Sequence, residues 1–231
     1  MTGLAQEVPE KAYDWVVASR SPKKVGPFVR YVASRGWNDQ IVVDCDASSA
    51  GPEQPHFSID HRKVSTQDKI GRCCLNRLLH SKALRPLARR GWIAFESGVI
   101  RISDNDHEDR DEVDSHHDMD LCILYLETVD GRRTVHLSQG VEMPTGAMEA
   151  SARSHYTVTA GRFIAEMLST PDHLVDHADW HAAVTMNANG AIELTRSDAL
   201  FEAVRVLFAR HERKLLEAKA VAAWHERMNL R

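Results

Sequence analysis

The first candidates for chemistry are two aspartates at the end of an apolar stretch. Asp44 and Asp46 follow the residues IVV in the run IVVDCD. Alternate residues of a strand point to one face, so both carboxylates can lie together. Such a pair holds Mg²⁺ in several phosphoryl-transferring folds, and Asp60 on a following strand would complete the cluster. One interpretation is therefore a magnesium-dependent phosphoryl-transfer or nuclease-type enzyme. The other is a strand end that leads into a solvated loop.

Three histidines form the second candidate group. His173, His177 and His181 are spaced four residues apart in PDHLVDHADWH. On a helix, residues i and i+4 share a face, and a histidine pair at this spacing can hold zinc. The intervening residues do not match HExxH, and each step of four drifts by about 40° around the helix. We therefore interpret them as surface or interface histidines and predict no cofactor.

The strongest signal is a charge step in the middle of the chain. Residues 62–101 contain ten Lys and Arg and two acids, whereas residues 104–120 contain nine acids and one Arg, so the net charges are +8 and −8. A basic block favours a polyanionic partner, because Lys and Arg neutralise phosphates and release counterions. The residues expected to contact nucleic acid are Arg72, Arg77, Lys82, Arg85, Arg89, Arg90 and Arg101.

The basic block is predicted to contain two helices and a hairpin. One helix runs from Ser65 or Thr66 to about His80, a second from Lys82 to Arg90, and two strands flank the turn 96–98. This segment resembles the end of a winged-helix domain, where a helix with leucines three apart ends at a glycine before two strands. The matching residues are Leu84, Leu87, Gly91, Trp92, Ile93, Gly98, Ile100, Arg101 and Ile102. The resemblance implies DNA contact by the helix and the wing.

The acidic block is too polar to pack against a core, so we predict a solvated linker loop over 104–120. It separates an α/β region, 1–103, from a hairpin and helical region, 121–231. Its carboxylates and histidines (His107, His116 and His117) have no regular metal-ligand spacing. A cover for the basic face and a metal site are alternative interpretations.

The remaining elements predict an α+β fold with a helix-rich C-terminal half. Expected helices cover Pro9–Ser19, Pro22 to Gly36, and Pro171 to Ala182, and expected strands cover Ile41–Val43, Leu121–Thr128, Thr134–Leu137 and Ala191–Leu194. The last helix runs from Asp198 to about Met228 and would be about 45 Å long. It either packs along the domain or projects and pairs with a second subunit or another protein.

Composition narrows the class of protein. Hydrophobic residues make up 43% and charged residues 27%, which is ordinary for a globular chain. No apolar run is long enough to cross a membrane, and the four cysteines lack metal or redox spacing, so we expect a cytoplasmic protein with reduced thiols. The leading hypothesis is a non-catalytic nucleic-acid-binding protein, DNA before RNA, acting as a regulator or as a subunit of a nucleoprotein assembly. The alternatives are the magnesium enzyme and a protein-binding inhibitor that uses the acidic loop or the last helix.

Overall fold

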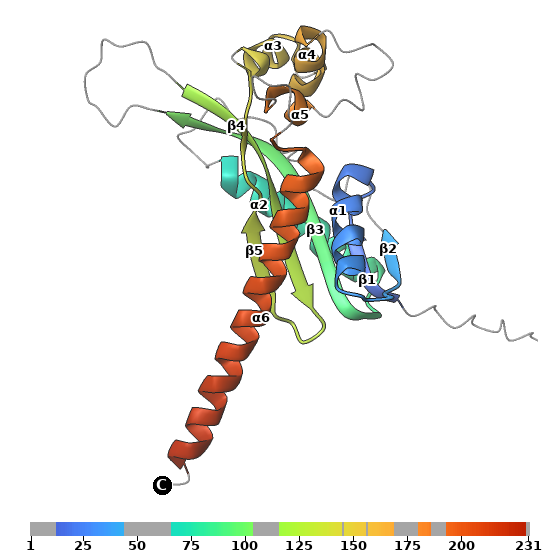
Figure 1. The fold of residues 1–231 in the computed structure, drawn as a ribbon, viewed down its shortest axis with the longest axis vertical. Coiled ribbons are helices and arrows are strands. Elements are labelled where there is room, and N and C mark those ends of the chain that lie inside the picture. Colours follow the sequence, from blue (N-terminus) through green and yellow to red (C-terminus); the bar gives the residue numbers. More distant parts are fainter. Residues whose placement is uncertain are drawn as a thin grey trace, which may run out of the picture.

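The protein has a mixed α/β fold built on a six-stranded sheet. A computed structural model describes residues 13–43, 66–103, 116–144, 146–155, 157–168, 180–185 and 193–229. The strands are β1 (Tyr13–Ala18), β2 (Ile41–Val43), β3 (Ala88–Ser103), β4 (His116–Thr128), β5 (Arg133–Leu137) and β6 (Val141–Glu142). The sheet order is β2-β1-β3-β4-β5, and β6 also pairs with β4 (Figure 1). β1 is parallel to β2 and β3, and the later pairs are antiparallel.

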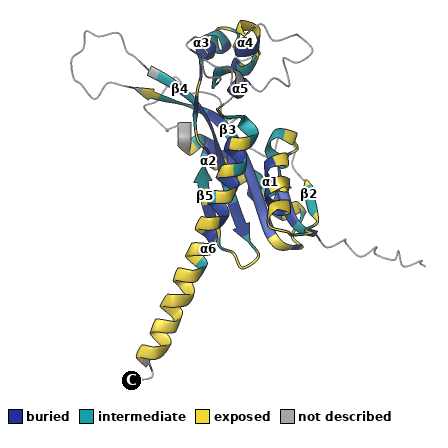
Figure 2. Ribbon diagram, viewed as in Figure 1, coloured by how far each residue is buried: buried dark blue, intermediate teal, exposed yellow. Residues whose placement is uncertain are grey.

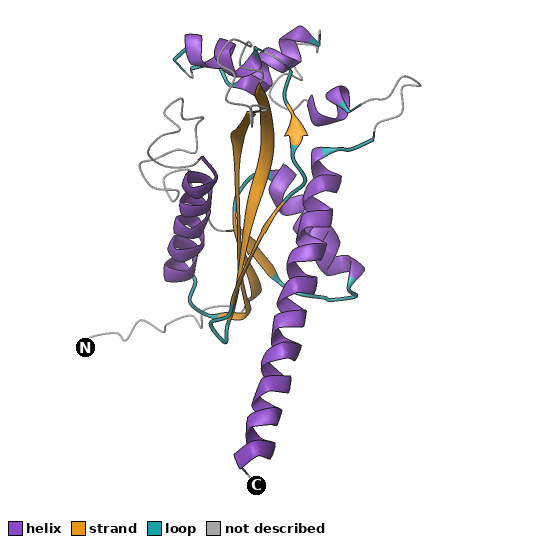
Figure 3. Cartoon of the chain, turned by 90° about the vertical axis from the view of Figure 1, so that its left-hand side faces the viewer, coloured by secondary structure: helices purple, strands orange, loops and turns teal. Residues whose placement is uncertain are grey.

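Helices cover both faces of the sheet (Figure 3). They are α1 (Pro22–Ser34), α2 (Thr66–Leu84), α3 (Ala147–Arg153), α4 (Ala160–Met167), α5 (Trp180–Val184) and α6 (Arg196–Asn229). α1 and the first half of α6 pack on one face, and α2 packs on the other. α3, α4 and α5 gather at one end of the sheet, where we call them the cap helices (Figure 1).

Strand alternation divides the core between the two faces. In β3, Ile93 and Phe95 join the core under α1 and α6, whereas Trp92 and Ala94 join the core under α2. Because a strand with helices on both sides buries both of its faces, its amino-acid sequence is a nearly continuous run of apolar residues. β1 is such a strand, since Trp15 to Ala18 are all buried. This explains why the helix predicted over Pro9–Ser19 is wrong from Tyr13 onward.

The winged-helix-like segment is not confirmed. One helix, α2, extends to Leu84, and the predicted second helix over Lys82 to Arg90 is replaced by a turn at Pro86 and the start of β3. Proline lacks the N–H that a helix interior needs, which favours this turn. The predicted hairpin turn at 96–98 is wrong, because Gly98 pairs with Leu121 in the middle of an unbroken β3–β4 ladder.

Several other predictions are confirmed. α1 begins at Pro22, and Gly36 follows it with φ +68°; β4 and β5 join through Gly131 with φ +82°; and a long final helix is present. Of the acidic block, residues 116–120 belong to β4 and not to a loop, and residues 104–115 lie outside the described part of the chain. Cys73, Cys74 and Cys122 are buried. None of the described helices has the length and apolarity to cross a bilayer.

Candidate functional site

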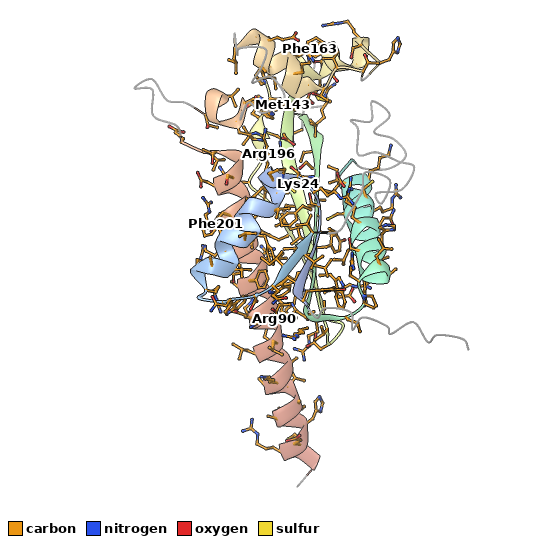
Figure 4. The ribbon with its side chains drawn as sticks, turned by 90° about the vertical axis from the view of Figure 1, so that its right-hand side faces the viewer. Lys24, Arg90, Met143, Phe163, Arg196 and Phe201 are labelled. Atoms are coloured by element: carbon orange, nitrogen blue, oxygen red, sulfur yellow. The ribbon has the colours of Figure 1, made fainter. Side chains whose placement is uncertain are left out.

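A layer of polar side chains lies where β1 ends and β3 continues. β1 pairs with β3 as far as Ala18 and Ala94, but β3 runs on to Ser103, and α1 begins just after β1. Ligands in open α/β sheets commonly bind in the crevice beyond the carboxyl ends of parallel strands. We call this group the polar layer; its members are Lys24, Glu96, Ser97, Asp120, His181 and Arg196. In Figure 4, Lys24 and Arg196 lie below the cap helices, in α1 and α6.

On the α2 face of the sheet, the polar layer is centred on Glu96. This glutamate is buried in β3, and Arg77 of α2 forms an ion pair with its Oε2. Lys24 Nζ lies 4.0 Å from Glu96 Oε1 and donates a hydrogen bond of 3.5 Å to the Phe95 carbonyl. Burial of a carboxylate is unfavourable unless cations accompany it, and here two cations do so.

On the opposite face, the polar layer is centred on Asp120. Arg196, the first residue of α6, donates to Ser97 Oγ at 2.7 Å and to Asp120 Oδ2 at 3.2 Å. His181 Nε2 lies 3.1 Å from the same Asp120 oxygen. A cavity of about 10 Å³, which is room for one water molecule, is lined by Asp120, His181, Arg196 and Cys122, among others. Burial raises the pKa of the Cys122 thiol, so this sulfur stays protonated at neutral pH.

A larger cavity of about 400 Å³ lies beside the Asp120 half of the polar layer. Its lining comes from the β5–β6 connection, β6, α5 and the segment before α6: Gln139, Gly140, Val141, Glu142, Val184, Thr185, Glu193 and Leu194. Gln139 lines both this cavity and the small one. Its volume is within the usual range for small-molecule sites. A ligand bound here would have the polar layer at one end.

At least four of the seven predicted nucleic-acid contacts form ion pairs with other described residues of the protein. Arg77 pairs with Glu96, and Lys82 pairs with Glu127. Arg90 Nε lies 3.1 Å from Asp39. Arg101 binds both oxygens of Asp118 at 2.8 Å and one oxygen of Glu149 at 2.8 Å.

The hydrogen bonding that Arg101 donates to Asp118 is the main reason that the pKa of Arg101 is raised, and these contacts join β3 and β4 to α3. Arg72 and Arg89 are exposed, and Arg85 is half-buried. Arg72 lies about 18 Å along α2 from Leu84, where the helix ends. Arg85 comes directly after that end, and Arg89 lies at the start of β3. The exposed part of the basic block is therefore dispersed, and nucleic-acid contact stays a prediction.

Most of the predicted metal ligands lie outside the described residues: Asp44, Asp46, Asp60, His173 and His177. β2 ends at Val43 opposite Val17, so the chain leaves β2 at the edge where α1 begins. His181 lies in α5 and contacts Asp120. Within the described ranges, no group of three or more His, Cys, Asp or Glu could hold a metal ion.

The site residues predicted from the sequence did not include Glu96, Asp120, Arg196 and Lys24. The available signal was a charged residue inside an apolar strand, which is rare unless it has a partner. Glu96 is such a residue in WIAFESGVI, and Asp120 precedes the apolar run LCILYL. Glu96 was instead interpreted as part of a turn.

Comparisons with known proteins bear on the fold alone. No family model and no curated protein matches the chain. Among solved structures, protein VC0702 from Vibrio cholerae matches with a TM-score of 0.56 and 14% identity, over 85% of this chain and 93% of that one. A nucleoside-triphosphatase/dITP/XTP pyrophosphatase from Mycobacterium abscessus matches at 17% identity over 67% of this chain and 97% of that one. Its TM-score of 0.30 carries no argument. The chain thus shares the fold of VC0702.

Proposed function

We propose that the protein binds a nucleoside polyphosphate at the polar layer and hydrolyses a phosphoanhydride bond in it with the help of a divalent cation. One observation carries the proposal. Two pairs of a cation and a buried carboxylate, Lys24 with Glu96 and Arg196 with Asp120, lie beyond the end of β1 on opposite faces of the sheet, the second pair beside a cavity of about 400 Å³. Anion-binding and cation-binding groups are thus adjacent, as phosphoryl transfer requires.

The phosphate end of the ligand would lie against the start of α1. A helix N-terminus carries a partial positive charge and N–H groups that suit phosphate oxygens. Lys24 is in the first turn of this 13-residue helix. Arg196 adds a planar guanidinium, which binds phosphate with two parallel hydrogen bonds. Both side chains are partly exposed, so they can exchange a carboxylate contact for a phosphate contact.

A divalent cation would enter with the phosphates. Mg²⁺ is commonly bound by one or two carboxylates together with substrate phosphates and water, and it neutralises charge on the transferred group. Glu96 and Asp120 are the matching oxygen donors in the polar layer. In hydrolysis, the water oxygen bonds to phosphorus and the bridging P–O bond breaks. The proton of the water passes to one of these carboxylates, and the products are a shorter nucleotide and phosphate or pyrophosphate.

The larger cavity suits the nucleobase. Glu142 and Glu193 in its wall repel phosphate and can accept hydrogen bonds from a base, while Val141, Val184 and Leu194 offer apolar contact. The charges of the two regions therefore orient the ligand. Its polyphosphate points toward Lys24 and Arg196, and its base points toward the cavity.

The test is turnover on a panel of ribo- and deoxyribonucleoside triphosphates, including ones with altered bases, in Mg²⁺ or Mn²⁺. We expect release of phosphate or pyrophosphate from at least one of them. Lys24→Met and Arg196→Met should each lower kcat/KM by about 100-fold, as loss of a transition-state donor does. Lys219→Met makes the same change on the exposed end of α6 and should leave kcat/KM unchanged.

The proposal is refuted if the folded chain shows no turnover of any of these nucleotides and no saturable binding of them. The same preparations can be titrated with duplex DNA and with RNA across a salt series. Tight, salt-dependent binding that is lost when the exposed Arg72 and Arg89 become Glu would favour the nucleic-acid hypothesis instead.

A further inference from the structure

The two halves of α6 have different surroundings. In the first half, residues such as Leu200, Val204 and Leu207 are buried against the sheet and α1. His211 is the last buried residue, and from Glu212 to Met228 every side chain except the half-buried Leu215 is exposed (Figure 2). This second half, which we call the projecting segment, extends about 25 Å at 1.5 Å per residue.

The projecting segment carries an apolar stripe. Leu216, Val221, Trp224 and Met228 are 65%, 55%, 53% and 50% exposed. Leu216, Ala220, Trp224 and Met228 follow one another at intervals of four, so they form a row that winds slowly over one side of the helix, by about 40° per step. A helix in water gains most of its stability from packing such a side against something else. The described part of the chain does not cover this stripe.

We propose that the stripe pairs with the same stripe of a second copy, with the two helices antiparallel about a two-fold axis near Ala222. This pairing places Leu216 opposite Met228 of the second copy and the small Ala220 opposite its Trp224. Rows four apart on one helix can fit between rows three apart on the other with the axes about 20° apart, as in most four-helix bundles, so contact extends along the stripe. The contact is self-complementary, as a two-fold interface must be.

Charge supports a second copy over other occupants. The same axis brings Glu217 opposite Arg227 of the second copy, twice in the dimer. A parallel pair would place Glu217 against Glu217. The segment 212–228 contains four basic and three acidic side chains, so it is nearly neutral. An anionic membrane surface or a polyanion would instead select a strongly basic face.

The test is the molar mass of the full chain in solution, by sedimentation or light scattering over a range of concentrations. We expect twice the 26.0 kDa of one chain. Trp224→Glu should raise the dissociation constant at least about tenfold, because it places a charge in the buried centre of the interface. Circular dichroism checks that the helix is retained.

A charge exchange tests the orientation. Glu217→Lys or Arg227→Glu alone creates two like-charged pairs and should weaken the dimer by about tenfold. The double variant restores opposite charges and should recover the parent affinity. Glu226→Lys, on the side of the helix away from the stripe, is the control and should change nothing. A chain that stays monomeric at 100 μM overturns the proposal. So does a dimer that ignores Trp224→Glu, or one that the double variant fails to restore.

Discussion

Two buried glutamates on the α2 face of the sheet allow stability and function to be separated. Glu96 lies in the polar layer between Lys24 and Arg77, and Glu127 lies near the far end of β4 between Lys82 and Arg133. Both carboxylates have two cationic partners, but only Glu96 belongs to the proposed site. Glu→Gln at each position removes one negative charge and almost no volume. The two variants therefore form a matched pair.

The expected loss of stability in each variant depends on how far the remaining cations are exposed to water. The side chains of Lys24 and Arg77 are 16% and 17% exposed, whereas those of Lys82 and Arg133 are 40% and 48% exposed. Removing one partner of a buried pair typically costs about 3–5 kcal/mol, because a charge is left unpaired in the interior. We expect about 3 kcal/mol for Glu96→Gln. Cations nearer to water lose less, so we expect about 1 kcal/mol for Glu127→Gln.

Urea denaturation gives the free energy of unfolding of both variants, and nucleotide hydrolysis gives their activity below the unfolding range. Glu96→Gln should abolish turnover, whereas Glu127→Gln should keep the parent kcat/KM. Equal loss of stability in both variants would refute the reasoning about solvent access. Full activity in a folded Glu96→Gln protein would refute the assignment of Glu96 to the site.

Two further predictions concern the frame around the site. A Cβ on Gly91 would lie 2.2 Å from the Glu127 carbonyl oxygen, so Gly91→Ala should force β3 and β4 apart and destabilise the fold by more than about 3 kcal/mol. In the helix α2, a Cβ on Gly71 would have its nearest neighbouring atom 3.9 Å away, so Gly71→Ala should stabilise the fold by about 0.5–1 kcal/mol. Both values can be read from urea midpoints. Burial lowers the pKa of His211, which contacts Thr128 and Thr134 by hydrogen bonds. The unfolded state therefore takes up a proton more readily as pH falls through about 6.5, and stability should fall from pH 7.5 to 5.5 more in the parent than in His211→Gln.

Local signals predicted the elements whose ends are set by proline or glycine. Pro22 and Gly36 correctly predicted the two ends of α1, and the Asp130-Gly131 turn correctly predicted the β4–β5 hairpin. β1 and β3 could not be predicted in the same way. Their conformation depends on pairing partners far along the chain, which override local preference. Gly98 is an example, because it looks like a turn residue but lies in the middle of the ladder opposite Leu121.

The polar layer could not be predicted for a related reason. Its members come from α1, β3, β4, α5 and α6, and no short spacing links Lys24 to Arg196. Each residue alone has an ordinary interpretation as a surface lysine, a turn glutamate or a helix-capping arginine. Only the tertiary fold, in which β3 lies between β1 and β4, pairs Lys24 with Glu96 and Arg196 with Asp120.

Part of the charge step in the sequence lies within the antiparallel pairing of β3 with β4, in the described residues 116–120 of the acidic block. Where the chain returns from β3 to β4, the acidic start of β4 lies against the basic end of β3, so Asp118 pairs with Arg101. On the α2 face, Arg77 and Lys82 reach acids of the same two strands. Charges used in this way are held by carboxylates and attract phosphates only weakly at a distance. Within the basic block, the side chains that act as internal ion-pair partners are Arg77, Lys82, Arg90 and Arg101. This is why the function with the strongest support is at the polar layer, where cations and carboxylates lie beside a cavity of ligand size.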